Sequence, residues 1–126
     1  HLITPTKKKL TPNQLSTGLF AWKVVKHTKS NAIVVAKNNK IISISGGQTS
    51  RVDATKIAFE KTKIPKGCIV ASDAFFPFKD SIEKMAQYNI AAIIQPGGSI
   101  RDKEVVESCN KNKIAMAFTG FRVFKH

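Results

Sequence analysis

The sequence AIVVAKNNKIISI at residues 32–44 contains two short apolar runs, 32–36 and 41–44, on either side of a polar segment. Both runs are rich in β-branched residues, which favour strands. Asn38 and Asn39 tolerate the left-handed backbone conformation that a tight turn requires. The stretch therefore predicts a β-hairpin.

Helices and apolar strands alternate around this hairpin. Thr11 and Pro12 are typical of a helix start. The apolar positions that follow are spaced to share one helical face, namely Leu15, Leu19, Trp22 and Val25. After the hairpin, Ala54, Ile57 and Ala58 indicate a helix that ends before Pro65. The remaining predicted elements are a strand at 68–71, a helix at 80–89, a strand at 91–94, a helix at 102–112 and a strand at 114–118.

The continuous apolar character of these strands predicts a sheet that is buried on both faces. We therefore expect one α/β domain over residues 11–126, a three-layer α/β/α arrangement with a mixed sheet. Residues 1–10 carry a lysine run without periodicity and are expected to form a loose leader.

The composition argues against several classes of protein. The 126 residues are 42% hydrophobic, too apolar for a disordered chain, and no run is long enough to span a membrane. No secretion signal is recognisable, so we expect a soluble protein that is not secreted. The two cysteines, Cys68 and Cys109, are too few for a disulfide framework or a four-cysteine metal site, and we expect reduced, buried thiols.

The formal charge of +13 raises nucleic acid as a partner. The lysines are spread along the chain, however, and only Arg51, Arg101 and Arg122 are arginines. Arginine is the residue suited to bidentate recognition of carboxylate or phosphate, so a small anion is as plausible a ligand as a polynucleotide.

Ligands of open α/β sheets collect where strands end, and five such places carry unusual residues. They are the loops at 26–31, 46–51, 72–80, 95–102 and 119–122. In the third loop, Phe75, Phe76 and Phe78 surround Pro77 between Asp73 and Asp80. These rings either form an aromatic shelf for a flat heterocycle or plug the end of the sheet, and the sequence leaves both alternatives open.

The glycine turns at 46–47 and 97–98 either present amides to an anion or simply begin a helix. His27 is either a general base beside Lys26 or a helix-end residue, and the second role is favoured. The zinc-deaminase and Gly-x-Ser-x-Gly motifs are absent, and no metal ligand set is predicted.

Taken in order, several motifs resemble the bifunctional purine-biosynthesis family that combines AICAR transformylase with IMP cyclohydrolase. They are FAWKVVKH (20–27) with KSNA (29–32), GQ and SRVD (47–53), SDAFFPF (72–78), QPGGSIRD (95–102) and FTGFR (118–122) with the terminal His126. The resemblance covers nearly everything after residue 18 and corresponds to the second of two transformylase repeats, the C-terminal part of the family's chain.

The resemblance implies a cytidine-deaminase-like fold without zinc. It implies formyl transfer from 10-formyltetrahydrofolate to AICAR in a cytosolic homodimer whose active sites use residues of both subunits. It also implies a partner region in the same polypeptide, no nucleic acid and no membrane. Some members hold a structural potassium ion, and no residue of this sequence decides that point.

Site roles are carried over by motif. Substrate binding is implied for Asn31, Arg51, Phe75 and Arg122. Folate binding is implied for Val52, Pro77, Phe78, Asp80, Ser99 and Ile100. The family's catalytic Lys-His pair belongs to the first repeat, whereas Lys26-His27 is followed here by the second repeat's signature. The resemblance therefore assigns no catalytic residue to this chain and predicts that it is inactive alone. A stand-alone nucleic-acid-binding or anion-binding module is the alternative.

Overall fold

The computed structural model describes residues 2–76 and 79–120. Its elements in chain order are α1 (Pro12–Lys26), β1 (Ile33–Lys37), β2 (Lys40–Ser45), α2 (Arg51–Glu60), β3 (Ile69–Ser72), α3 (Lys79–Ala86), β4 (Ala92–Gln95), α4 (Asp102–Lys111) and β5 (Ala115–Phe118). The predicted types and order are confirmed, with boundaries that differ by one to three residues. None of the helices in the described part is long and apolar enough to cross a membrane.

The described strands form one mixed sheet in the order β2-β1-β3-β4-β5. β1 is antiparallel to both of its neighbours, whereas β3, β4 and β5 are mutually parallel. Asn38 and Asn39 have φ values of 50° and 59° in the hairpin turn, as the sequence predicts. The strands that are connected through helices are thus parallel to one another, and the short turn joins the antiparallel strands β1 and β2.

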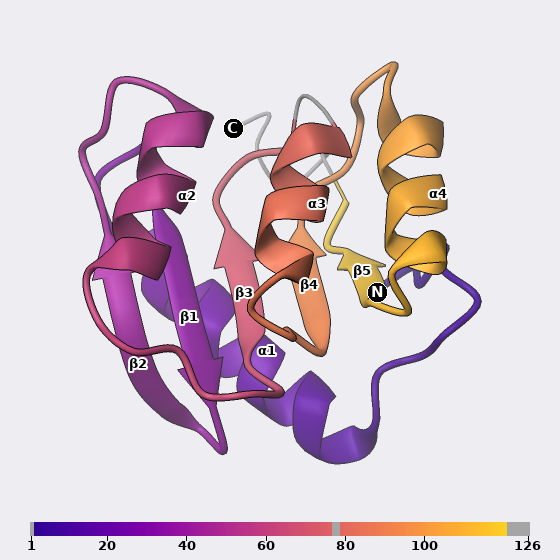
Figure 1. The fold of residues 1–126 in the computed structure, drawn as a ribbon, viewed down its shortest axis with the longest axis horizontal. Coiled ribbons are helices and arrows are strands. Elements are labelled where there is room, and N and C mark those ends of the chain that lie inside the picture. Colours follow the sequence, from indigo (N-terminus) through magenta and orange to yellow (C-terminus); the bar gives the residue numbers. More distant parts are fainter. Residues whose placement is uncertain (1, 77–78, 121–126) are drawn as a thin grey trace.

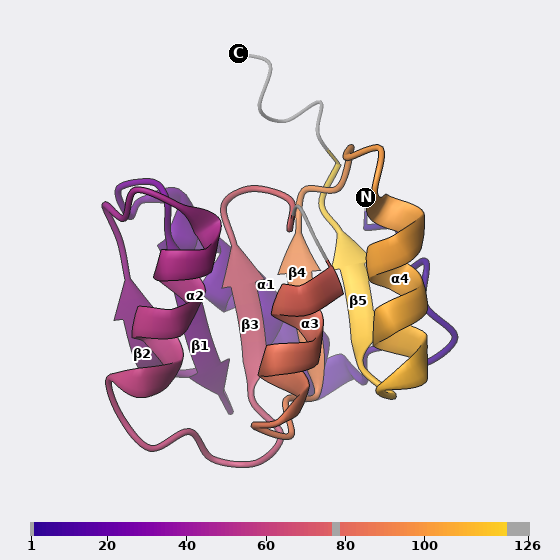
Figure 2. The same ribbon diagram turned by 45° about the horizontal axis from the view of Figure 1, so that its top comes forward.

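Helices cover both faces of the sheet, so the three-layer α/β/α prediction is confirmed. α2, α3 and α4 lie side by side on one face, and α1 lies on the other (Figures 1 and 2). The larger hydrophobic cluster lies under the three helices and includes Ile33, Val70, Ile93 and Met116. A second cluster lies between α1 and the sheet and includes Trp22, Val34 and Ile94.

The buried face of α1 differs from the predicted stripe. Trp22 and Val25 are buried as expected, but Leu19 is 37% exposed and its predicted inward position is wrong. The reason is Gly18, where an added Cβ would lie 2.1 Å from Cδ1 of Ile94. The missing side chain lets α1 approach the sheet closely at Gly18, and this contact rotates Leu19 outward.

Residues 2–10 run along the edge strand β5. Ile3 and Phe118 exchange two backbone hydrogen bonds of 3.1 and 2.7 Å. The hydroxyl of Thr6, which is 1% exposed, accepts the Met116 N–H at 2.9 Å. This segment, expected from its composition to be a loose leader, covers the edge of the sheet.

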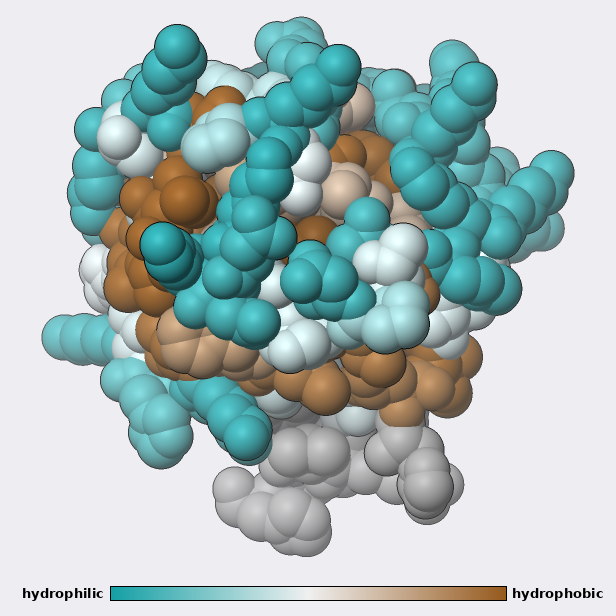
Figure 3. All heavy atoms as spheres, turned by 90° about the horizontal axis from the view of Figure 1, so that it is seen from below, coloured by the Kyte–Doolittle hydropathy of each residue, from teal (hydrophilic) through white to brown (hydrophobic). Residues whose placement is uncertain are grey.

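The end of the sheet with the hairpin turn and the loops that enter β3, β4 and β5 carries many projecting hydrophilic side chains, with apolar areas beside them (Figure 3). Its loops carry lysines: Lys37, Lys40, Lys61, Lys63, Lys66 and Lys113. The predicted site residues that the structure describes lie in or beside the loops of the opposite end.

Candidate functional site

The described parts of the five loops singled out from the sequence lie at one end of the sheet. Because β1 is antiparallel to β2 and β3, its first residue Ile33 lies beside Ser45 and Ser72, the last residues of those strands. β4 and β5 are parallel to β3, so their carboxyl ends follow at the same edge. The sheet therefore brings together loops that are far apart in the chain.

A buried ion pair lies at the centre of this edge. Arg51, the first residue of α2, places Nη1 2.6 Å from Oδ1 of Asp73, which follows β3. The two side chains are 7% and 10% exposed. Burying two charges is costly unless both are well hydrogen-bonded. The stability of this ion pair therefore depends on the hydrogen bonds that surrounding residues make to it.

Asn31 completes the arrangement. The Arg51 Nη1 also donates to the Ala32 carbonyl at 2.9 Å, and Nη2 donates to Oδ1 of Asn31 at 2.9 Å. The Asn31 amide group donates in turn to the Gln48 carbonyl at 3.0 Å. Asn31 and Gln48 also exchange two backbone hydrogen bonds, which join the loops on either side of the hairpin.

Asp73 holds the same loop from the other side. It accepts a hydrogen bond from the Ser30 hydroxyl at 2.5 Å and one from the Ala32 N–H at 3.2 Å. The peptide bond between Ser30 and Asn31, within this loop, is cis. Three loops are thus fixed to one another around a single guanidinium group.

One donor of this guanidinium remains unused. The Arg51 Nε is buried and has no hydrogen-bond partner among the described residues. A buried donor without an acceptor costs about 1–3 kcal/mol. Nε is closed off from solvent, so a ligand acceptor could reach it only after the side chains that cover it had moved. The network that joins three loops around Arg51 marks this edge as the candidate binding site.

The phenylalanine loop contains one buried ring and one exposed ring among its described residues. Phe76 is fully buried and donates its N–H to Oε1 of the buried Gln95 at 3.1 Å, so it plugs the end of the sheet. Phe75 is 41% exposed and is available as an aromatic surface. Pro77 and Phe78, predicted to bind folate, lie outside the described residues.

The other predicted folate residues lie on two helices and a loop of the same end. Val52, beside Arg51 in α2, is 47% exposed, and Asp80 is exposed in the first turn of α3. Ile100 is fully exposed, whereas the Ser99 hydroxyl accepts the Arg101 N–H. Together with Phe75, Val52 and Ile100 give this end exposed apolar side chains from one helix and two loops. Arg122, the remaining predicted substrate residue, lies outside the described residues.

The two glycine turns act mainly as helix entries. Ser50 caps α2 by accepting the Asp53 N–H. In the β4–α4 loop the Gly98 N–H is taken by the Asp102 carboxylate at 2.7 Å. That amide is therefore already occupied, which argues against the anion role that the sequence left open for this turn.

The remaining candidates lie elsewhere. His27 is the C-terminal cap of α1, the helix-end position favoured from the sequence. Cys68 and Cys109 are free and buried, as expected, and burial raises the pKa of the Cys109 thiol to about 12. No group of three or more acidic, histidine or cysteine side chains in residues 2–76 and 79–120 is arranged to hold a metal.

Sequence reasoning did not identify the partners of Arg51 and Phe76. Asp73 was noted only as a nearby carboxylate, and the roles of Ser30, Gln48 and Gln95 were missed. Their one sequence signal is position, because Asp73 and Gln95 lie at or just beyond the ends of apolar runs. Only the strand order brings these ends together.

The chain is similar to proteins of one family over most of its length. The model of the family described as AICARFT/IMPCHase bienzyme matches residues 1–61. The bifunctional purine biosynthesis protein PurH of Aquifex aeolicus is 57% identical over 125 residues, covering 96% of this chain and 25% of the relative. The PurH proteins of Petrotoga mobilis and Acetivibrio thermocellus are 59% and 57% identical over 108 and 122 residues. They are covered over 21% and 24% of their length, so the chain spans about a quarter of these curated relatives.

Proposed function

Because this chain belongs to the AICARFT/IMPCHase bienzyme family, we propose that it is the part of an AICAR transformylase that binds AICAR and 10-formyltetrahydrofolate. It corresponds in this proposal to the second transformylase repeat. The rest of the enzyme, in the same polypeptide, supplies IMP cyclohydrolase activity. The whole protein then acts as a cytosolic homodimer in purine biosynthesis.

The Arg51 network carries the proposal. Asp73 neutralises the guanidinium and Asn31 holds its orientation, and a ligand acceptor that displaced the side chains over Nε would pair the one buried donor of this group that has no partner among the described residues. The carboxamide oxygen of AICAR is an acceptor of the required kind. Phe75, exposed at the same end of the sheet, offers its ring to the flat base.

The folate would lie on the more apolar part of this end. Val52 and Ile100 are exposed apolar side chains, and Asp80 is an exposed acceptor for the N–H edge of a pterin ring. Pro77 and Phe78 are assigned to the folate, and Arg122 to the ribose phosphate, by motif alone.

The proposed chain binds substrates without performing the proton transfers. In formyl transfer the 5-amino nitrogen of AICAR attacks the formyl carbon, and a base removes its proton as the folate N10 departs. His27 caps α1 at its C-terminus and is not assigned as that base. We therefore expect no formyl transfer by the purified 126-residue chain, and turnover that His27→Ala abolishes would contradict this assignment.

Calorimetric titration of the chain with AICAR tests the binding role. Arg51→Lys should weaken binding by about tenfold, because a lysine cannot reproduce the planar donor arrangement. Phe75→Ala should also weaken it, and this exposed position does not endanger folding. Arg101→Lys, an arginine in an exposed ion pair with Glu104, serves as the matched control.

Equal AICAR affinity in the wild type, Arg51→Lys and Phe75→Ala would refute the assignment. Binding of oligonucleotides with a steep salt dependence, in place of AICAR binding, would instead favour the basic-module alternative.

A further inference from the structure

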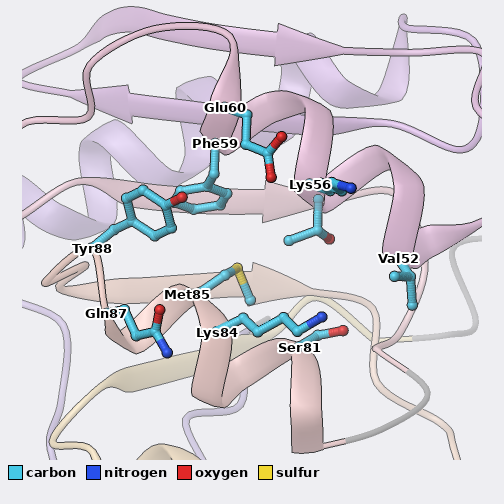
Figure 4. Close-up of a pocket in the computed structure, with 10 residues that line it drawn as sticks. Val52, Lys56, Phe59, Glu60, Ser81, Lys84, Met85, Gln87 and Tyr88 are labelled. Atoms are coloured by element: carbon cyan, nitrogen blue, oxygen red, sulfur yellow. The ribbon is translucent and has the colours of Figure 1, made fainter.

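A groove between α2 and α3 lies on the outer face of the helical layer. It has a volume of about 330 Å³, and both helices contribute side chains to its walls (Figure 4). Pockets for small molecules measure about 300–1,000 Å³. The groove is therefore large enough for one small ligand, and Val52 at its end is the one lining residue that the proposed folate site shares with it.

The floor of the groove is apolar and partly aromatic. Phe59 from α2 and Met85 from α3 are 4% and 1% exposed. The ring of Tyr88, which follows α3, lies with its centroid 4.8 Å from that of Phe59. A thioether and two rings form a surface on which a flat ring can pack.

The walls of the groove carry an excess of positive charge. Lys56 from α2 and Lys84 from α3 line opposite walls (Figure 4). Neither makes an ion pair with a described residue, and Glu60 is the one acidic residue that lines the groove. Two ammonium groups against one carboxylate leave an excess of positive charge in the groove, which favours an anion.

We propose that the α2–α3 groove binds a small molecule in which a flat ring is joined to an anionic group. The ring packs on Phe59, Met85 and Tyr88, and the anion lies between Lys56 and Lys84. Two sources have this chemistry, namely the benzoylglutamate portion of a folate and a nucleoside monophosphate. The groove is separate from the Arg51 network and shares only Val52 with the proposed folate site. The folate source rests on the proposed function, whereas the groove itself does not require the AICAR assignment.

Binding of two probes to the 126-residue chain distinguishes these sources. p-Aminobenzoylglutamate and inosine 5′-monophosphate are titrated separately into the chain, with amide chemical shifts recorded by NMR. The expected result is that one probe shifts the amides of α2 and α3. Lys56→Gln and Lys84→Gln should each weaken that probe by about threefold to fivefold, the size of one partly screened charge interaction.

Glu60→Gln distinguishes an electrostatic effect of Glu60 on anion binding from a structural role of its side chain. Removing this negative charge should tighten binding of the anion, whereas loss of a structural contact would weaken it or leave it unchanged. Lys23→Gln is the matched control, because Lys23 is an exposed lysine on α1, on the opposite face of the sheet. Thermal unfolding of each variant verifies that these exposed substitutions leave the fold intact.

The outcomes separate this proposal from the previous one. Shifts confined to other surfaces, no binding at low millimolar probe, or equal affinity in the lysine variants and the control would overturn the groove site while leaving the AICAR assignment standing. Failure of AICAR to bind, together with charge-dependent probe binding at α2 and α3, would refute the proposed function and support the groove.

Discussion

Removal of the Asp73 carboxylate should destabilise the protein strongly, because it leaves the Arg51 guanidinium buried without a counter-ion. The pair is joined at 2.6 Å with side chains 7% and 10% exposed, and Asp73 also accepts hydrogen bonds from Ser30 and Ala32. Breaking a buried pair from one side costs about 3–5 kcal/mol. We expect a loss of this size from Asp73→Ala.

The corresponding thermal shift follows from the length of the chain. An unfolding entropy of about 2.1 cal/mol/K per residue amounts to about 0.26 kcal/mol/K for the 126 residues. The expected loss then lowers Tm by about 10–20 °C. Urea unfolding followed by the fluorescence of Trp22, the only tryptophan, measures the free energy, and circular dichroism measures Tm.

Two further variants test whether the unpaired charge of Arg51 causes the loss of stability. Glu104→Ala breaks the exposed ion pair with Arg101 and should cost no more than about 1 kcal/mol. Adding Arg51→Met to Asp73→Ala removes the unpaired charge and should restore part of the lost stability. The argument fails if Asp73→Ala costs no more than Glu104→Ala, or if the double variant is less stable than Asp73→Ala alone.

Two other predictions concern the pH dependence of stability and the amino-terminal segment. Because burial raises the pKa of the Cys109 thiol to about 12, the folded protein retains above pH 9 a proton that the unfolded chain releases. The free energy of unfolding should therefore fall as pH rises from 9 towards 12, by at most about 1.4 kcal/mol per unit from this group, and Cys109→Ala should flatten the slope. If the free energy of unfolding, measured with urea at pH 9–11, fell equally steeply with pH in the wild type and in Cys109→Ala, this prediction would be contradicted. Thr6→Val should cost about 1–3 kcal/mol in the same assay, because the buried Met116 N–H loses its acceptor. If Thr4→Val lowers the free energy of unfolding by the same amount, the loss in Thr6→Val does not come from the hydrogen bond of the Thr6 hydroxyl.

Local patterns were sufficient for the elements and for the strand-end loops in which the candidate site lies. The Asn-Asn turn, the Thr11-Pro12 helix start and the apolar runs each act over a few residues, so they could be recognised without the fold. The five candidate loops were identified for a similar reason, since polar, glycine and aromatic residues interrupt the apolar runs where the strands end.

Contacts between distant residues were not predictable in this way. The pairing of Ile3 with Phe118 joins the two ends of the described chain, and periodicity gives no sign of it. Likewise, Phe75 and Phe76 are neighbours of the same type. At the sheet edge the Phe76 ring is buried and its backbone N–H donates to the side-chain oxygen of Gln95, whereas Phe75 is 41% exposed.

The amino-acid sequence by itself determined an α/β/α domain, the residues at the ends of its strands and, through its motifs, its family. These are properties of short stretches, whose periodicity and turn residues act locally. The tertiary structure decided that Arg51 is neutralised by Asp73 and held by Asn31, and that Phe59, Met85 and Tyr88 form the floor of one groove. Those contacts exist because β1 lies antiparallel beside β3 and because α2 and α3 pack side by side, and strand order and helix packing are set by the whole core.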